Sequence, residues 1–573
     1  MPSPALSLAA LLACCVPALV AFNLPPSATF FNQAAALGLW GVFAALLGMP
    51  RGRAGGRAAI VLLGALALLV LSVLWSAAVA LPASLAASAL GLLLGALVMA
   101  WSGAALQGPA RAAALQVFLL GWVVVGVLSS LIALVQVFAP NWADGVLVAR
   151  SGLPGRAVGN LRQPNHLSTL LLWSLVALVP LREAGRFSTR STALLGALMV
   201  VGIELSGSRT GTLGVLLLAL WGVVDKRLSR PTRLLLLGAP LFYGAWAMAL
   251  KTLQADSTLG AATRLGEADV SGSRFGIWRN TVEMIAQQPW TGVGFGEFNF
   301  AWTLTPFPGR PVAFFDHTHN VVLQFAVELG VPLALLVLGL LGLALWQAWR
   351  RTWAVKGVAG TALRALFVMV LLVALHSQLE YPLWYAYFLL PAAWMWGVCL
   401  GTPPAVPAEA AAAPRRALMS RLPGLLLAAG AVFSLMDYGR VVSIFSPGAD
   451  AGPLAQRIED GQHSVFFAHH ADYAAATTAD APADALVAFE RATHFLLDTR
   501  LMQAWAEALA DAGDLDRARH VAQRLREFHY PQSEPFFAPC AASALLKAAD
   551  EKPFQCEAPQ KALEWRDFLD VMP

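Results

Sequence analysis

The sequence predicts an all-α polytopic membrane protein of about 13 transmembrane helices, followed by a small helical domain outside the membrane. Composition is the first observation behind this prediction: 58% of the 573 residues are hydrophobic and only 13% are charged, whereas soluble proteins carry about 25% charge. The second is a series of thirteen apolar stretches, most of them near the roughly 20 residues that cross a bilayer. Together they exclude a soluble multidomain protein of this length.

The thirteen apolar stretches end at residue 438. They lie at 5–22, 32–49, 58–76, 84–101, 113–138, 166–181, 191–206, 210–224, 234–250, 318–346, 365–380, 384–400 and 421–438. The first stretch lacks a basic start and a recognisable cleavage site, so we interpret it as a retained span and not as a signal peptide. Residues 365–400 are also compatible with a broken hairpin.

The distribution of Lys and Arg among the loops predicts the orientation. With the N-terminus inside, the inner loops hold 18 of these residues and the outer loops hold nine. This orientation places the loops 139–165 and 251–317 outside, together with the tail 439–573. We therefore divide the chain into a transmembrane domain, 1–438, which includes both outer loops, and an outer domain, 439–573.

The outer tail is predicted to be helical and acidic. Apolar residues recur at helical spacing from Ala483 to Phe528. Leu509, Gly513 and Ala518 match part of a tetratricopeptide pattern, which makes a repeat-like domain one interpretation. The tail carries 12 basic and 20 acidic residues, a net charge of −8, whereas the remainder of the chain has a net charge of +13.

The five cysteines fit this topology. Cys14, Cys15 and Cys399 lie in predicted spans, and Cys540 and Cys556 are the two in the outer tail. Two cysteines in an oxidising compartment are expected to form a disulfide. The alternative is a pair of free buried thiols.

The histidines of the transmembrane domain predict an outward-facing polar site. His166, His317, His319 and His376 all fall at the predicted outer face, and polar residues at membrane depth usually serve function. The alternative for any one of them is a hydrogen-bonded histidine at the interface.

The segment from Asp316 to Asn320 holds the densest cluster and opens the tenth apolar stretch. We expect Asp316 to cap this helix. The first turn would then attract phosphate and keep a histidine neutral, fit to act as a base. His317 and His319 would face different sides of a helix, which argues against a shared metal ion.

Arginines at the outer face form a second group of candidates. They are Arg156, Arg162, Arg209 and Arg274. Arginine near a bilayer needs an anionic partner, and its guanidinium group binds phosphate in bidentate fashion. We therefore expect these side chains to bind a diphosphate. The alternative partners are lipid headgroups or acids such as Glu204 and Asp269.

Further polar residues at the outer face are expected to bind substrate. They are Asn160, Gln163, Asn165 and His166 near the sixth span, Asn320 after the histidines, and His376, Glu380 and Tyr381 at the end of the eleventh span. An aromatic belt at the interface would explain the tyrosines there but not His376 and Glu380. The glycine-rich turn at 292–296 lacks the strand and helix of a nucleotide site.

Three segments resemble the O-antigen ligase/polymerase superfamily, and within it the PglL-type bacterial protein O-oligosaccharyltransferases. They are Gly159–His166, His317–Asn320 running on to Gly330, and His376–Tyr387. The resemblance covers most of the chain, more weakly in the first four spans and the tail. It implies a membrane glycosyltransferase fold (GT-C-like) in the inner membrane of a Gram-negative bacterium, with the site and the tail in the periplasm.

The resemblance also implies a reaction. A preassembled oligosaccharide would pass from undecaprenyl diphosphate to a Ser or Thr hydroxyl of a periplasmic protein such as pilin. His319 would be the general base, with His317 as runner-up, and Arg209 and Arg274 would stabilise the leaving diphosphate. No metal, cofactor or nucleic-acid partner is expected, whereas membrane lipids are.

Three alternatives stay open. An O-antigen ligase that transfers O-antigen to the lipid A core would use the same donor and a similar site. A glycan polymerase is a further alternative. A lipid-glycan transporter without chemistry belongs to a different class, which favours internal repeats and polar groups at the midplane. The long outer tail and the segment Glu380–Pro382 favour a protein acceptor.

Overall fold

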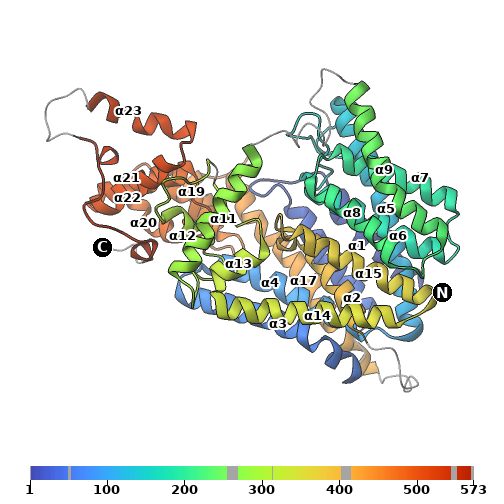
Figure 1. Cartoon of the computed structure of the whole chain (residues 1–573). Helices are drawn as coiled ribbons and strands as arrows, with labels where there is room; N and C mark the ends of the chain where they lie inside the picture. The colour runs from blue at the N-terminus through green and yellow to red at the C-terminus, as the bar shows by residue number, and fades with distance from the viewer. Residues whose placement is uncertain are drawn as a thin grey trace. The chain divides into compact units, whose positions relative to one another are not determined.

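Helices account for all the regular structure in the parts of the chain that the computed structural model describes (Figure 1). These parts are residues 2–48, 53–253, 269–312, 314–401, 414–543 and 552–569. Within them, nine helices are long and apolar enough to cross a membrane, judged by length and composition. The prediction of an all-α polytopic membrane protein is confirmed.

The helices of the membrane part follow the predicted apolar stretches closely. The nine candidate spans belong to α2 (Phe30–Leu47), α3 (Arg53–Val79), α4 (Ala83–Ala105), α5 (Gly108–Phe138), α6 (Pro164–Glu183), α9 (Arg230–Leu253), α14 (Val331–Ala354), α15 (Gly357–His376) and α17 (Pro414–Phe445). Shorter helices are α1 (Pro4–Leu19), α7 (Thr189–Leu205), α8 (Arg209–Val224) and α16 (Ala386–Leu400). Each predicted stretch overlaps one of these thirteen helices.

The tenth predicted span, 318–346, is interrupted. The chain first forms the short helix α13 (Val321–Leu329), turns at Gly330 and then continues as α14. Gly330 has a φ of +74°, and a side chain there would collide with the backbone of Trp290. Only glycine adopts this conformation in so little space. The break separates the residues near the histidines from the membrane-spanning part of the helix.

The chain packs into two compact units, each built from segments that are distant in sequence. The first comprises Met1–Ala67, Leu92–Glu267 and Leu338–Leu435, and the second comprises Leu68–Gly91, Ala268–Val337 and Met436–Pro573. Residues 269–317, the end of the predicted loop 251–317, therefore belong to the same unit as the tail. From the sequence we had placed this loop in the transmembrane domain. Residues 254–268 of that loop lie outside the described parts. The predicted boundary at 438 falls inside α17.

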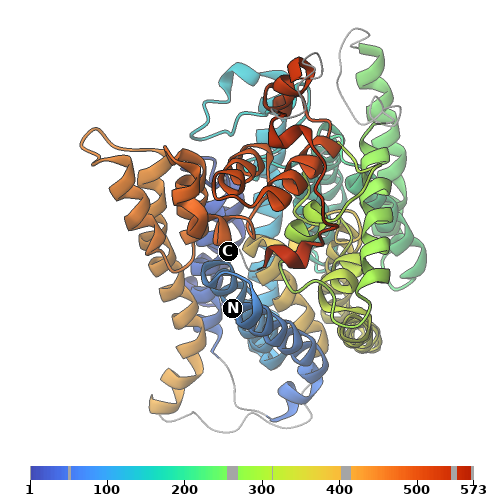
Figure 2. The same cartoon turned by 90° about the vertical axis from the view of Figure 1, so that its left-hand side faces the viewer.

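The second unit contains a set of short helices. From the outer loop come α11 (Asp269–Gln287) and α12 (Phe298–Leu304), followed by α13. The tail supplies α18 (Leu454–Gln462), α19 (Ala468–Thr478), α20 (Leu486–Ala492), α21 (Thr499–Asp511), α22 (Leu515–Glu527) and α23 (Glu534–Ser543). The tail helices are coloured orange to red in Figures 1 and 2. The predicted helical tail is present, and Gly513, with a φ of +86°, joins α21 to α22.

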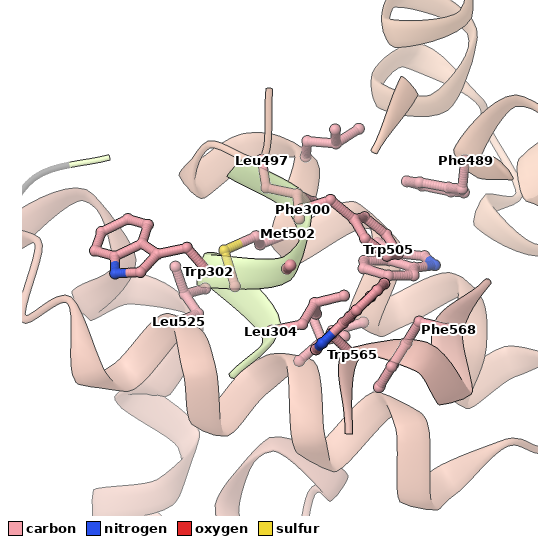
Figure 3. Packing of buried hydrophobic residues seen from close by; sticks show 14 of the residues in the cluster. Phe300, Trp302, Leu304, Phe489, Leu497, Met502, Trp505, Leu525, Trp565 and Phe568 are labelled. Carbon is pink, nitrogen blue, oxygen red and sulfur yellow. The ribbon is translucent and has the colours of Figure 1, made fainter. Parts of the chain in front are cut away.

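The core of the second unit combines α12 with the tail (Figure 3). Phe300, Trp302 and Leu304 of α12 are fully buried among tail side chains that include Trp505 and Phe568. Burial of a large aromatic side chain stabilises a fold by roughly 1.5–3 kcal/mol. The core of the tail therefore includes a helix that ends at Leu304, about 135 residues before the tail begins.

The cysteines of the tail form a disulfide. Cys540, at the end of α23, is bonded to Cys556 in the short 3-10 helix η6 (Phe554–Cys556). The bond closes a segment that includes residues 544–551, which lie outside the described parts. Cys14, Cys15 and Cys399 are free and buried.

Candidate active site

The two candidate catalytic histidines lie in an irregular segment just before α13. Asn320 caps this helix, because its Oδ1 accepts hydrogen bonds at 3.0 Å from the backbone N–H groups of Val322 and Leu323. The prediction that Asp316 is the cap was wrong, since the helix begins only at Val321. Asp316 instead pairs with Nδ1 of His317.

The imidazole rings of His317 and His319 lie next to each other. Their centroids are 4.3 Å apart and the rings are inclined by 53°. His319 has a φ of +55°, a left-handed conformation that is rare for residues other than glycine and is often found at functional sites. His317 is buried at 3% exposure, whereas His319 is partly exposed. Our expectation that a helix would direct the two rings to different sides does not apply, because the segment is not helical.

Hydrogen bonds from three directions hold the middle of this segment. Trp278 of α11 donates from Nε1 to the carbonyl oxygen of Thr318 at 2.9 Å. The N–H of Thr318 donates to Oε1 of Gln324 at 2.7 Å, and its hydroxyl donates to the carbonyl oxygen of Asn320 at 2.8 Å. The backbone between the two histidines is thus fixed by neighbouring helices.

Asn299 of α12 connects the segment to the tail. Its Nδ2 donates to the carbonyl oxygen of Phe315 at 2.7 Å, and its Oδ1 accepts a hydrogen bond from the N–H of Leu497 at 2.8 Å. The side chain is only 2% exposed. We did not predict this residue from the sequence, because nothing in the local pattern shows that it joins the segments around Phe315 and Leu497.

Two carboxyl groups in this region have shifted pKa values. Burial raises the pKa of Glu328, in α13, to about 8, against a hydrogen bond that it accepts from Nε2 of Gln324 at 2.9 Å. Burial also acts to raise the pKa of Asp316, but the neighbouring His317, and more weakly His319, bring it below its ordinary value. The carboxyl group of Asp316 therefore loses its proton more readily than a free Asp does, whereas Glu328 keeps its proton to a higher pH than a free Glu does.

Arg274 lies on α11 in the same unit as the two histidines. It is partly buried and precedes Trp278 by four residues, so the two side chains share a face of the helix. Trp278 is the residue that contacts the histidine segment. The side chain of Asp269, which we considered as an alternative partner of Arg274, lies outside the described residues.

A second group of predicted residues gathers in the first unit, around the start of α6. Nδ2 of Asn165 donates to Oε1 of Glu380 at 3.2 Å, and its Oδ1 accepts from the hydroxyl of Ser208 at 2.6 Å. The hydroxyl of Ser168 donates to that of Ser208 at 3.0 Å. These contacts bring together α6, the turn before α8 and the segment after α15. We call this set the α6 cluster.

Two histidines belong to the α6 cluster and are both buried. Nδ1 of His166 lies 3.0 Å from the hydroxyl of Tyr387, and Nδ1 of His376 lies 2.8 Å from the hydroxyl of Thr169. The ring centroids of the two histidines are 5.8 Å apart. Tyr381, in contrast, is partly exposed at the end of the same cluster.

Arg156 fixes the turn that precedes α8. Its Nε donates to the carbonyl oxygen of Ser206 at 3.0 Å, and its Nη2 donates to that of Gly207 at 3.3 Å. Gly207 has a φ of +58°. Because Arg209 is the first residue of α8, Arg156 supports the turn that presents Arg209. The diphosphate binding that we expected of Arg156 stays a prediction.

Three more predicted residues contact backbone. Arg162 donates at 2.8 Å to a carbonyl oxygen just after α1, and Asn160 donates at 2.6 Å to one at the end of α1. Asn160 also accepts a hydrogen bond from the N–H of Ala149. Gln163 caps α6, because its Oε1 accepts a hydrogen bond at 2.9 Å from the backbone N–H of His166. These contacts hold the loop before α6 against α1.

Comparisons with known proteins agree with the resemblance seen in the sequence. Residues 194–338 match the family described as O-antigen ligase. This segment includes Arg209, Arg274 and both candidate histidines. Residues 364–544 match the family described as virulence factor membrane-bound polymerase, C-terminal. Residues 157–181 match the family described as protein glycosylation ligase.

Two relatives come from Acinetobacter baylyi. The chain is 30% identical to a general O-oligosaccharyltransferase over 286 residues, which is 48% of each chain. It is 24% identical to a ComP-specific O-oligosaccharyltransferase over 249 residues, which is 43% of this chain and 44% of the relative. The chain thus spans about half the length of the curated relatives that it matches.

The long apolar helices indicate a multi-pass membrane protein, and residues 194–338 are similar to the O-antigen ligase family. The resemblance to PglL-type protein O-oligosaccharyltransferases is confirmed.

Proposed function

We propose that this protein transfers a preassembled oligosaccharide from undecaprenyl diphosphate to Ser or Thr hydroxyl groups of periplasmic proteins such as pilins. The segment with His317 and His319 is the observation that carries this proposal. Two adjacent imidazoles, one of them partly exposed, are held by buried hydrogen bonds inside the matched O-antigen ligase region. The names of the two relatives support an acceptor that is a protein.

The proposed location is the inner membrane of a Gram-negative bacterium, with the active site and the tail in the periplasm. Contacts inside the second unit support a common side for the tail and the turn between α3 and α4. The hydroxyl of Ser84 lies 3.1 Å from Nδ1 of His469, and Ser88 donates to the carbonyl oxygen of Phe466 at 2.9 Å. The Lys and Arg bias predicts that this turn is outside.

In the proposed reaction His319 acts as general base. A hydroxyl group is a poor nucleophile and needs a base within reach. The acceptor oxygen bonds to C1 of the first sugar, the bond from C1 to the diphosphate oxygen breaks, and the imidazole receives the hydroxyl proton. His319 suits this role because its ring is partly exposed, whereas His317 is buried and paired with Asp316. His317 would orient its neighbour and is the alternative base.

The leaving group is undecaprenyl diphosphate, whose negative charge grows as the bond to the sugar breaks. Arg209 and Arg274 would stabilise this charge through bidentate hydrogen bonds. Arg156 and Arg162, which donate to backbone carbonyl groups, would hold the surrounding loops in place. For the glycan we propose binding by Asn165, Glu380 and Tyr381, supported by the buried His166 and His376, in the first unit, and by Asn320 in the second unit.

Two other activities use the same donor. The description of the family matched by residues 194–338 favours an O-antigen ligase that modifies the lipid A core. The description of the family matched by residues 364–544 favours a polymerase of glycan repeats. Both would keep the base and the arginines and would differ in the acceptor.

A competition between acceptors tests the proposal. The purified full-length protein receives lipid-linked oligosaccharide together with a pilin-like protein and lipid A core in one reaction. We expect glycan on the protein, detected by mass spectrometry, and no product with the His319→Ala variant. Glycan on the lipid A core alone would replace our proposal by the ligase function. Activity that EDTA stops and a divalent ion restores would contradict the metal-free mechanism.

A further inference from the structure

A groove in the second unit contains none of the residues assigned so far to catalysis. It consists of two hollows of about 800 Å³ and about 360 Å³ that share Gln462 and Arg491. The larger hollow is lined by the turn between α3 and α4 and by α18, α19 and α20. The smaller one continues over α19, α20 and the 3-10 helix η3 (Pro482–Ala485). The shared residues make the two hollows one elongated path.

The walls of the groove carry small apolar side chains. Eight alanines line the two hollows: Ala80, Ala83, Ala87, Ala468, Ala475, Ala479, Ala485 and Ala488. Alanine leaves room for the backbone of a ligand to approach the helices closely. The shape and this lining suit an extended polymer better than a compact small molecule.

Acidic groups dominate the charge of the groove. Three acidic residues line it: Asp472, Asp484 and Glu490. Among the described lining residues, Arg491 is the one Lys or Arg. Burial raises the pKa of Asp472, against a hydrogen bond from Gln462 at 2.9 Å and the nearby Arg491. Arg491 lies 3.7 Å from Asp472, so its charge is partly balanced within the groove. Asp484 and Glu490 are left to attract a cationic ligand.

We propose that this groove binds a basic, extended segment of the acceptor polypeptide, whose Lys or Arg side chains contact Asp484 and Glu490. The proposal rests on the proposed function, since that function requires a protein acceptor. The charge of the tail as a whole, −8, favours the same kind of partner.

The groove lies on the part of the tail that supports the catalytic segment. His494 lines the larger hollow, and its Nδ1 lies 2.6 Å from Oε2 of Glu297. Three residues later, the N–H of Leu497 bonds to Asn299, which holds the carbonyl group of Phe315. An acceptor bound in the groove would therefore contact the same stretch of chain that positions the catalytic histidines.

A peptide-binding experiment tests the groove without any catalytic step. The full-length protein in detergent is titrated with a short fluorescent peptide of alternating Lys and Ser, and with a counterpart in which Glu replaces Lys. We expect the lysine peptide to bind with an affinity that falls as salt is raised, and the glutamate peptide not to bind.

Matched variants locate the binding. The double variant Asp484→Asn/Glu490→Gln should weaken lysine-peptide binding roughly fivefold, as expected for two partly exposed ion pairs. The control Glu507→Gln/Asp511→Asn removes two charges from exposed positions of α21 outside the groove and should bind as the wild type does. Equal loss in both variants, or no loss in either, would overturn the proposal.

A transfer experiment separates the groove from the function. With lipid-linked oligosaccharide and a pilin-like acceptor, Asp484→Asn/Glu490→Gln should raise KM for the acceptor and leave kcat and the slow hydrolysis of the donor by water unchanged. A wild-type protein that binds the lysine peptide but transfers no glycan would refute the function and keep the groove. Maltohexaose, a neutral oligosaccharide, serves as a probe for glycan binding. If the groove variants lose the binding of maltohexaose that the wild type shows but still bind the lysine peptide, the groove binds a glycan and the proposal is overturned.

Discussion

Two pairs of histidines, one in each compact unit, differ in their exposure, backbone conformation and hydrogen-bonding partners. His166 and His376 of the α6 cluster are buried at 2% and 0% exposure, and each lies against a hydroxyl group. His319 is partly exposed and has a left-handed backbone, and His317 behind it pairs with a carboxylate. A base must reach its substrate, whereas a buried histidine with a fixed partner holds helices together. Exposure and backbone conformation therefore distinguish His319 from the other three histidines.

The largest effect that we expect is the loss of catalysis in His319→Ala. Removal of a general base typically costs about 10²–10⁴ in rate, and a partly exposed loop residue contributes little to stability. The measurement is glycan transfer by protein of unchanged melting temperature. His463→Ala, which alters an exposed histidine of the tail, serves as the control. Full activity of His319→Ala would remove the distinction between the two pairs.

Next in size is the effect of the arginines. Arg209→Ala and Arg274→Ala should each lower kcat by roughly 10²-fold, since a hydrogen-bond donor to developing charge is worth that much in other enzymes. Lysine at either position should restore only part of the rate, because it lacks the bidentate geometry. Complete rescue by lysine would show that charge alone matters. Arg279→Ala on α11 provides a comparison for Arg274 on the same helix.

A smaller effect, about tenfold in kcat, is expected for Asn299→Ala, because a displaced catalytic group reacts more slowly. Asn299→Asp keeps the acceptor for the N–H of Leu497 but loses the donor to the carbonyl group of Phe315. Asn299→Asp should therefore reduce kcat as much as Asn299→Ala does. Its melting temperature should fall less than that of Asn299→Ala. An unchanged kcat in both variants would show that the tail does not position the histidines.

His376→Ala tests the other side of the comparison. It should lower stability by about 2–4 kcal/mol, because it leaves a cavity and an unpaired hydroxyl of Thr169. Activity per folded molecule should fall far less than in His319→Ala. A stable His376→Ala protein without activity would move this histidine from support to catalysis.

The last prediction concerns Glu328 and pH. Its pKa is about 8 in the folded protein and about 4.3 in an unfolded chain. The folded state thus keeps a proton that the unfolded state loses, so this group's contribution to stability falls as pH rises from about 4 to about 8. Glu328→Gln cannot ionise. The melting temperature of Glu328→Gln minus that of the wild type should increase from pH 5 to pH 9. A difference that stays constant over this range would contradict the raised pKa of Glu328.

Much of the fold follows from the sequence, because burial in a membrane requires long apolar helices. All thirteen predicted stretches overlap helices, and the tail is helical as its spacing indicates. The start of α13 was misplaced because Asp316 and Asn320 are equally good caps, and only tertiary contacts select between them. The packing of α12 into the tail was not predictable, since periodicity shows which face is buried but not against which segment.

The roles of the candidate site residues stay predictions, whereas their hydrogen bonds could not be read from the sequence. Asn160 donates to a carbonyl group of α1, Arg156 donates to the turn before α8, and Gln163 accepts from the N–H of His166. A sequence shows that a polar side chain needs a partner but not whether that partner is a ligand or a carbonyl group. Asn299 was missed for the same reason, since both of its partners are backbone groups far away in the chain.

The shared aromatic core also has a consequence for biosynthesis. Phe300 and Trp302 leave the ribosome long before Trp565 and Phe568, with which they are finally buried. Until the tail helices have been made, α12 has no complete core to enter, and its Asn299 gains a bond to the tail only once Leu497 has been made. A chain interrupted before residue 497 would therefore leave the segment with His317 and His319 without this support.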